Sequence, residues 1–254
     1  MFGEGPVTVN GNTYIISRTA VSAKTSSVSI RGRTITIKVS SYLPREEVVR
    51  TFIELRGKVI KDLEKHPDLG QPPPEVEFFN GQALELQGKP FKISIHEDKG
   101  SKISKGDYVN GEVVIRLAEG LGGNKKKTHA SNLCRRVISH ILSPEVILRV
   151  KELDSENYDF GINKVFIKDT ITRWGSCNQK KKNINLNFRL LFAPTWVMDY
   201  VIIHELAHIK EGNHSKAYWS LVESAFPNYK EARKWLKLNG DKLGAAQPAV
   251  DTSS

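Results

Sequence analysis

Two histidines and a glutamate near the C-terminal end of the chain have the spacing of a metal site. His204 and His208 are four positions apart in an apolar segment, and Glu205 follows the first of them. On a helix of about 3.6 residues per turn, residues four apart share one face, so both imidazoles would point at one ion. Glu205 would stand about 100° round the helix, where a carboxylate can reach a water on that ion and act as a general base. This is the HExxH arrangement.

A catalytic zinc ion usually has three protein ligands and one open position, so a third donor is needed. His214 is the expected third ligand. Gly212 and Asn213 would end the helix after Glu211, because glycine accepts positive φ, and the chain would then turn His214 back toward the ion. Glu223, on the next predicted helix, is the alternative. The sequence thus predicts one Zn²⁺ per chain, held by the three histidines.

Ordinary polar histidines on a half-buried helix are the plain alternative to a metal site. In a chain of this composition HExxH should arise by chance in roughly 1% of cases, and the third histidine lowers this to roughly 0.04%. Chance is therefore a poor explanation of the pattern.

The elements around these residues can be predicted from apolar periodicity and turn residues. Thr128 would cap a helix that Ser143-Pro144 breaks, with a second helix beyond. A strand over 164–168, a turn at RWGSC (173–177) and a strand over 184–187 follow. Pro194 would begin the HExxH helix. An apolar stripe predicts a further helix as far as Pro227, and a short last helix would stop at Asn239-Gly240.

The N-terminal half is predicted to be rich in β-structure. Asn10-Gly11 suits a hairpin turn within 7–16, and alternating residues over 28–39 predict a second hairpin. A helix is expected over 44–65, then a stiff connector over 66–75 and further strands with tips at Asn80-Gly81 and Asn110-Gly111. The repeated Asn-Gly tips raise the question of a duplication, but no side-chain identity beyond the turns supports one.

The predicted fold class is α+β, with a boundary in the glycine- and lysine-rich segment 119–127. Residues 1–120 would form a β-rich region containing the helix 44–65. Residues 128–240 would form a compact zincin-like catalytic domain, a short sheet with the HExxH helix and the helices after it. The small, polar residues 241–254 are expected to form a disordered tail.

The composition of this 254-residue chain indicates its cellular location and the chemical class of its partners. Its two cysteines are too few for a disulfide framework, no signal peptide opens it, and no apolar stretch would span a bilayer, so we expect a cytoplasmic protein without membrane contact. The net charge of +10 favours an anionic partner, namely a nucleic acid, a nucleotide or an acidic protein. Two lysine runs, 125–127 and 180–182, are either solvated loops or binding sites. Lys180, Lys181 and Lys182 are the stronger candidates for substrate binding, because they join RWGSC to the strand that leads into the HExxH helix.

Four segments in order resemble the YgjP-like metallopeptidase family, which is related to the SprT-type zinc peptidases: RWGSC (173–177), INLNFRLLFAP (184–194), DYVIIHELAHIKEGNHSKAYW (199–219) and FPNYKEARKWL (226–236). The resemblance is weaker over the N-terminal half but runs nearly end to end. It implies a zinc peptidase that acts on protein or peptide substrates. In related peptidases a strand before the HExxH helix pairs with extended substrate, which makes Asn185 and Asn187 candidate substrate-binding residues.

Arg173 and Tyr218 are further candidates for catalysis, each with a structural alternative. A guanidinium beside the zinc could hold a substrate carboxylate, phosphate or carbonyl, but Arg173 could equally pair with Asp169 or Asp199. Tyr218 is four residues after His214, so its hydroxyl could reach the oxygen that gains charge in the transition state. Packing at the rim of the site is the alternative role of this tyrosine.

Three functional hypotheses follow. The first is a zinc-dependent peptidase, in which the ion lowers the pKa of its water and Glu205 takes the proton. The second is a metal-dependent nucleotide pyrophosphatase, which the positive charge would suit, although the sequence has no glycine-rich phosphate loop and no carboxylate cluster for magnesium. The third is a DNA-associated protease of the SprT type, whose N-terminal half would act as an adaptor.

Overall fold

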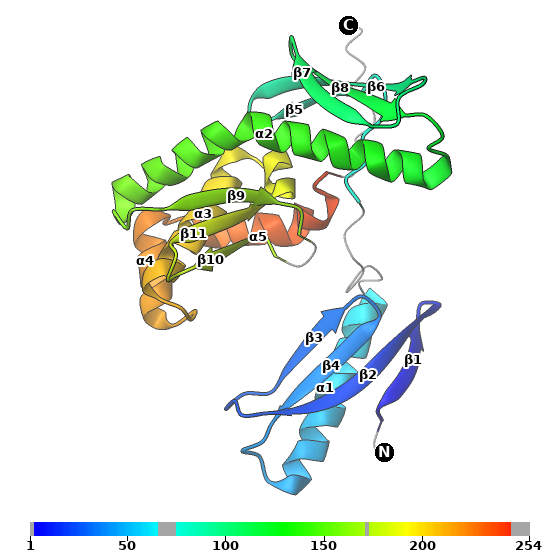
Figure 1. Ribbon diagram of the computed structural model, residues 1–254. Coiled ribbons are helices and arrows are strands. Elements are labelled where there is room, and N and C mark those ends of the chain that lie inside the picture. Colours follow the sequence, from blue (N-terminus) through cyan, green and yellow to red (C-terminus); the bar gives the residue numbers. More distant parts are fainter. Residues whose placement is uncertain (1–2, 66–74, 171–172, 245–254) are drawn as a thin grey trace, which may run out of the picture. The chain divides into compact units, whose positions relative to one another are not determined.

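The computed structural model describes residues 3–65, 75–170 and 173–244 (Figure 1). The chain divides into two compact units, Met1–Pro72 and Pro73–Ser254. Within the described residues it forms five α-helices and three small sheets, and each sheet contains both parallel and antiparallel neighbours. This is the mixed α+β class predicted from the sequence, with most strands in the N-terminal half. In the described residues, no helix has the length and apolar character needed to cross a membrane.

The first unit is built from two hairpins and one helix. Its strands are β1 (Gly5–Val9), β2 (Asn12–Val21), β3 (Ser27–Arg31) and β4 (Thr34–Ser40), in the order β1-β2-β4-β3 with β2 parallel to β4. The predicted hairpin tip is confirmed, because Asn10 and Gly11 have φ values of 48° and 75°. The helix expected over 44–65 is α1 (Arg45–Lys65), and it packs on the sheet in a core of its own.

The second unit begins with four strands and a long helix. The strands are β5 (Ala83–Leu86), β6 (Lys89–Asp98), β7 (Lys105–Val109) and β8 (Glu112–Ala118), in the order β5-β6-β8-β7. The predicted tip at Asn110-Gly111 is confirmed. The tip expected at Asn80-Gly81 is wrong: these residues turn before β5 begins, and the hairpin tip is Gln87-Gly88.

The long helix α2 (Gly123–Asn157) corrects two expectations. It begins before Thr128, and it passes through Pro144 without a break. Pro144 is exposed, while apolar residues of α2 on both sides of it, such as Leu142 and Val146, are buried. Packing against neighbouring elements therefore outweighs the helix-breaking preference of proline.

The observed division between the units also differs from the predicted boundary at 119–127. Apolar residues of β5, β6 and β8 share one continuous core with α2 and with the helices that follow. The segment 119–127 joins β8 to α2 and supplies the first residues of α2, so its glycines and lysines do not mark a domain boundary. The connector residues 66–74 lie outside the described residues.

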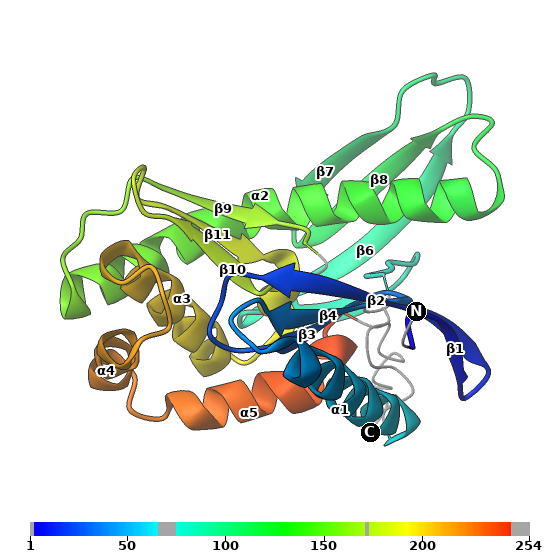
Figure 2. The ribbon, with the colours of Figure 1, turned by 90° about the horizontal axis from the view of Figure 1, so that it is seen from below.

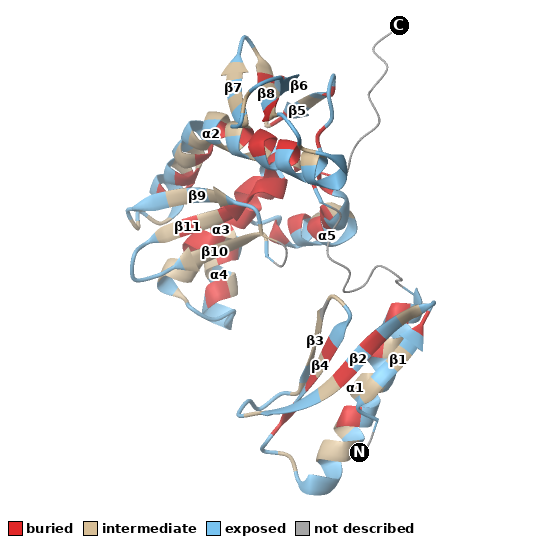
Figure 3. Cartoon of the chain, turned by 45° about the vertical axis from the view of Figure 1, so that its right-hand side comes forward, coloured by how far each residue is buried: buried red, intermediate tan, exposed pale blue. Residues whose placement is uncertain are grey.

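The remaining elements surround the HExxH helix α3 (Thr195–Lys210). They are β9 (Lys164–Lys168), β10 (Gly175–Asn178), β11 (Asn183–Asn187), the 3-10 helix η1 (Phe188–Phe192), α4 (Lys216–Ala225), α5 (Tyr229–Asn239) and the 3-10 helix η2 (Gly240–Lys242). Helix α2 contacts β7 and β8 on one side and β9 and α3 on the other (Figures 1 and 2). Most of α3 is buried (Figure 3).

The start of the expected disordered tail is in fact packed. Residues 240–242 form η2, and Leu243 is buried with its carbonyl accepting a hydrogen bond of 2.7 Å from Arg189 Nη1. The expectation is therefore wrong for residues 241–244. Residues 245–254 lie outside the described residues.

Asp154 holds the loop that leads from α2 to β9, and its removal should destabilise the second unit. The buried carboxylate accepts hydrogen bonds of 3.0 Å from Phe160 N and 2.9 Å from Gly161 N. Asp154→Ala leaves both donors without a partner, so we expect the free energy of unfolding to fall by about 3 kcal/mol. Chemical denaturation measures this loss. Glu156→Ala, at an exposed position of the same helix, is the matched control and should change stability by less than about 0.5 kcal/mol.

Candidate metal centre

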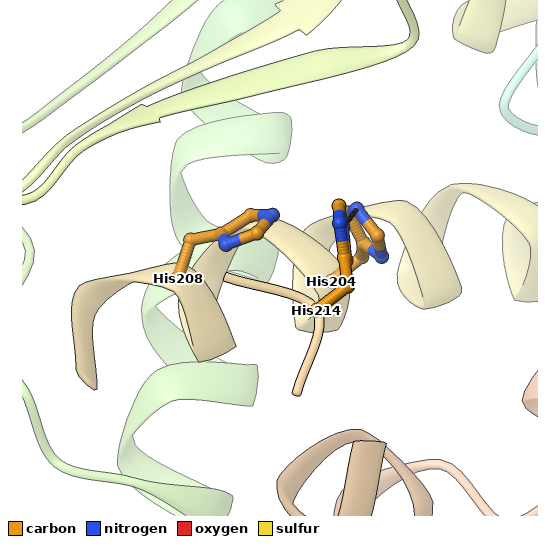
Figure 4. A group of neighbouring side chains, drawn as sticks. All are labelled: His204, His208 and His214. Atoms are coloured by element: carbon orange, nitrogen blue, oxygen red, sulfur yellow. Dashed lines mark hydrogen bonds between the residues drawn. The ribbon is translucent and has the colours of Figure 1, made fainter. Parts of the chain in front are cut away.

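The structure brings the three predicted histidine ligands together. His204 and His208 project from α3, and His214 approaches them from the loop before α4 (Figure 4). One ring nitrogen of each can be chosen so that all three lie within 4.8 Å of one another, and the Nε2 atoms of His204 and His214 are 3.3 Å apart. Two nitrogens bound to tetrahedral zinc at about 2.0–2.1 Å lie roughly 3.4 Å apart. The donor set therefore fits a single ion of this kind.

Neighbouring groups orient the two helical imidazoles. His208 Nδ1 lies 3.1 Å from the carbonyl oxygen of Glu211, which can only accept, so the proton is on Nδ1 and Nε2 is left with a free lone pair. The hydroxyl of Tyr200 lies 3.5 Å from His204 Nδ1. Tyr200 is four residues before His204, so helical spacing could have indicated this contact.

The surroundings favour neutral imidazoles, the form that binds metal. Burial lowers the pKa of His204 to about 3, and the nearby rings of His208 and His214 act in the same direction. Burial and His208 also lower the pKa of His214. No proton then competes with a metal for these nitrogens near neutral pH.

The loop that carries His214 is shaped differently from the prediction. Helix α3 ends at Lys210, as expected, but Gly212 does not have positive φ. A Cβ atom at Gly212 would instead lie 3.3 Å from the side chain of Gln179, in the turn between β10 and β11. A larger residue at position 212 would therefore make a tight contact with the end of the Gln179 side chain. Ser215 Oγ then accepts from Tyr218 N at 3.2 Å and caps α4.

Glu205 is buried against the first residue of β10. A Cβ atom at Gly175 would lie 2.6 Å from Glu205 Oε1 and 2.7 Å from its Cγ, so only glycine fits there. The sequence predicted a turn at RWGSC, whereas Gly175 begins a strand that packs on α3. Burial raises the pKa of Glu205 to about 8, and the charge of Arg173 opposes this shift.

The edge strand next to Glu205, which could pair with an extended substrate, is β10, and not the predicted strand over 184–187. In the sheet order β10-β11-β9, β11 lies between two partners, so its backbone groups are already paired. Asn185 donates to Ser176 Oγ at 3.0 Å, and buried Asn187 donates to Thr170 O at 2.7 Å. Both asparagines line a cavity of about 210 Å³ beside β10, which Arg173 and Gly175 also line.

The structural alternatives for Arg173 are wrong. Asp169 pairs with Arg135 at 3.1 Å, and Asp199 pairs with Arg149 at 2.8 Å. Arg173 is exposed at the cavity beside β10. Its position leaves it available to a ligand next to Glu205.

Tyr218 makes the contacts that its alternative packing role predicts. It is fully buried, and its hydroxyl donates a hydrogen bond of 2.9 Å to the backbone carbonyl of His204. The hydroxyl therefore supports the backbone of α3 at the first histidine.

The other sequence candidates lie around the centre. Lys180, Lys181 and Lys182 are exposed in the turn between β10 and β11, and Lys182 Nζ donates to Phe160 O at 2.7 Å. This turn contains Gln179 and thus touches the loop of His214. Glu223, the alternative third ligand, instead lies 3.8 Å from Lys230 Nζ.

Sequence reasoning missed Arg233 and Trp219. The Trp219 ring stacks on His214, with centroids 5.6 Å apart, and the Arg233 guanidinium lies 4.7 Å from the centroid of Trp219. The charge of Arg233 also acts, after burial, to lower the pKa of His204 and His214. Arg233 lies on α5, within the family-like segment 226–236 but without a spacing pattern that indicates chemistry, so only the tertiary structure shows that it stands beside Trp219.

Comparison with known proteins identifies the family. The model of the YgjP-like metallopeptidase domain matches residues 24–239. Among solved structures, the metallopeptidase zymogen of Pyrococcus abyssi abylysin is 28% identical, with a TM-score of 0.34, and the match covers 37% of this chain and 95% of that one. The zymogen of Methanocaldococcus jannaschii jannalysin is 22% identical, with a TM-score of 0.33 and the same coverage. The comparison with curated proteins found no match. Since the family model matches most of the chain, including every element of the candidate centre, the chain belongs to the YgjP-like metallopeptidase family.

Proposed function

We propose that this protein is a zinc-dependent metallopeptidase that hydrolyses peptide bonds. The observation that carries the proposal is the set of three imidazoles at single-ion spacing beside a buried carboxylate. His204, His208 and His214 would hold one Zn²⁺, which when bound lowers the pKa of a water toward 7 and polarises a carbonyl. Membership of a metallopeptidase family supports a protein or peptide substrate.

Glu205 is the general base in this proposal. It accepts the proton of the attacking water and returns it to the departing amine, which requires a carboxyl whose pKa is near the working pH. Burial, which raises its pKa to about 8, supports this role. The close contact with Gly175 fixes the carboxylate against β10, so proton transfer occurs beside the strand that would align the substrate.

Substrate would bind as an extended segment along the free edge of β10. Backbone pairing at a sheet edge recognises peptide groups and depends little on side chains. Arg173 lies beside Glu205, and Arg233 lies next to Trp219 on the side of His214. With Lys180, Lys181 and Lys182 they supply positive charge, which would favour acidic peptides. Nucleotides and DNA-bound proteins are the alternative anionic partners.

The zinc site can be tested by metal analysis. We expect one zinc per chain in the wild type and a dissociation constant raised more than about 100-fold in His214→Ala, because loss of a direct ligand should exceed the effect of losing a ligand's hydrogen-bond partner. Glu223→Gln is the matched control and should keep full zinc. Full zinc in His214→Ala, with loss in Glu223→Gln, would contradict the ligand assignment.

Glu205→Gln separates chemistry from metal binding. The variant should bind zinc and fold as the wild type does, while kcat/KM falls by roughly 10²–10⁴ because the base is removed. Both proteins should be assayed on unfolded protein, DNA-bound protein and nucleoside triphosphates. Cleavage of triphosphates alone, lost in the variant, would instead favour the pyrophosphatase alternative. Unchanged peptide cleavage in the variant would rule out Glu205 as the base.

Gly175→Ala tests the contact that fixes Glu205. The added methyl group would overlap the carboxylate and displace it, so we expect kcat to fall by roughly 100-fold while zinc content stays at one per chain. Gly122→Ala is the control, because nothing lies within 4 Å of a Cβ atom there and its φ is negative. Activity close to wild type in Gly175→Ala would show that this contact does not position the base.

A further inference from the structure

The beginning of the second unit repeats the topology of the first. In both, four strands form two antiparallel hairpins whose inner strands pair in parallel, and a helix follows. The orders are β1-β2-β4-β3 and β5-β6-β8-β7. The longest strands, β2 and β6, have 10 residues each, and β4 and β8 have 7 each.

The two copies also agree in register and in burial. Ile15 pairs with Thr34 in the first copy, and Lys92 pairs with Glu112 at the equivalent place in the second. In both copies, a serine just before the last-ordered strand accepts a hydrogen bond from the backbone at the end of the neighbouring strand. Ser26 Oγ accepts from Ser40 N, and Ser104 Oγ accepts from Ala118 N, both at 2.9 Å. The buried pairs that correspond are Tyr14 with Phe91, Ile16 with Ile93, Ile35 with Val113, Ile37 with Ile115 and Val39 with Leu117.

The copies differ in what the first hairpin tip contacts. The tip residues Asn10 and Gln87 have φ values of 48° and 50°, so their side chains start from equivalent backbone. Asn10 Nδ2 donates to Leu63 O at 3.2 Å and to Glu64 O at 3.3 Å, near the end of α1. Carbonyls at the end of a helix lack partners within it, and Asn10 supplies one.

In the second copy no helix ends at the corresponding point, because α2 continues far beyond it, so there are no helix-end carbonyls there for Gln87 to bind. Gln87 turns to another segment. Its Nε2 lies 2.8 Å from Ala193 O and 3.2 Å from both Leu190 O and Leu191 O, and its Oε1 accepts from Thr195 Oγ1 at 3.2 Å. Thr195 is the first residue of α3.

We propose that Gln87 is a positioning residue for α3, and so for His204, Glu205 and His208, a role that its counterpart Asn10 does not have. The amide group of Gln87 lies within hydrogen-bond distance of three carbonyls and one hydroxyl, at the point where the chain leaves η1 and enters α3. A helix is stiff, so fixing its first turn fixes the direction in which its later side chains point. The two copies thus share one topology, and the second uses its first hairpin tip to hold the start of the HExxH helix.

The test compares Gln87→Ala and Gln87→Met with Asn10→Ala in the full chain. Hydrogen exchange in metal-free protein reports the protection of amides in residues 195–204, and competition with a chelator gives the zinc dissociation constant. Only the zinc measurement rests on the proposed function. Gln87→Met keeps much of the side-chain bulk without the amide, so it remains informative if Gln87→Ala folds poorly.

We expect both Gln87 variants to speed exchange in residues 195–204 about tenfold and to weaken zinc binding by a similar factor, since the lost contacts are worth about one well-made hydrogen bond or more. Asn10→Ala should speed exchange only near the end of α1 and leave zinc binding unchanged. Three results would overturn the proposal: wild-type exchange in 195–204, equal acceleration in β9 and α5, or unchanged zinc affinity despite faster exchange. If the wild type bound no zinc, the proposed function would fail, and exchange alone would decide the role of Gln87.

Discussion

Burial of α3 on most of its sides is the constraint on which the candidate centre depends. Val197, Ile202, Ile203 and Leu206 are fully buried, and the helix contacts α2, α4, α5 and β10. Each such side chain contributes roughly 1.5–3 kcal/mol on leaving water. The helix cannot rotate without exposing them, so the two imidazoles in its C-terminal half keep their direction before any ligand binds. Little ordering is then needed on binding.

The polar contacts of α3 fix its rotation further. Buried Asp199 binds the guanidinium of Arg149 on α2 at 2.9 and 2.8 Å through both carboxylate oxygens. This two-point geometry fixes orientation as well as distance. Tyr218 binds the backbone of the helix at His204 from another side, through α4. The same burial that stabilises the helix changes its chemistry, because it raises the pKa of Glu205 and lowers that of His204.

The two copies of the four-strand topology show how one fold can serve different roles. Hairpin register, the serine hydrogen bond and buried positions agree, yet the buried side chains differ in size and type, as Tyr14 and Phe91 do. A fold of this kind needs apolar residues at alternating positions and turns of the right type, and many sequences meet both needs. This is why side-chain identity could not reveal the repeat. Because α2 is longer in the second copy, Gln87 has no helix end to contact and binds the segment before α3 instead.

The sequence by itself determined the features that depend on residues close together along the chain. The helical spacing of His204 and His208, the hairpin tip at Asn10-Gly11 and the helix over 44–65 follow from local geometry, and the family could be recognised from short motifs. Hydrophobic periodicity and turn type are set by neighbouring residues, so they do not depend on how the rest of the chain folds.

Only the tertiary structure decided the features that depend on pairing between distant segments. Pro144 stays helical because the helix is packed on both sides of it, and β10 rather than β11 lies at an edge of its sheet because β11 has a partner on each side. The contact of Gly175 with Glu205 and the place of Arg233 beside Trp219 join segments from different elements. Strand order and close approach are set by which surfaces bury each other, and a single sequence read along its length does not contain that choice explicitly.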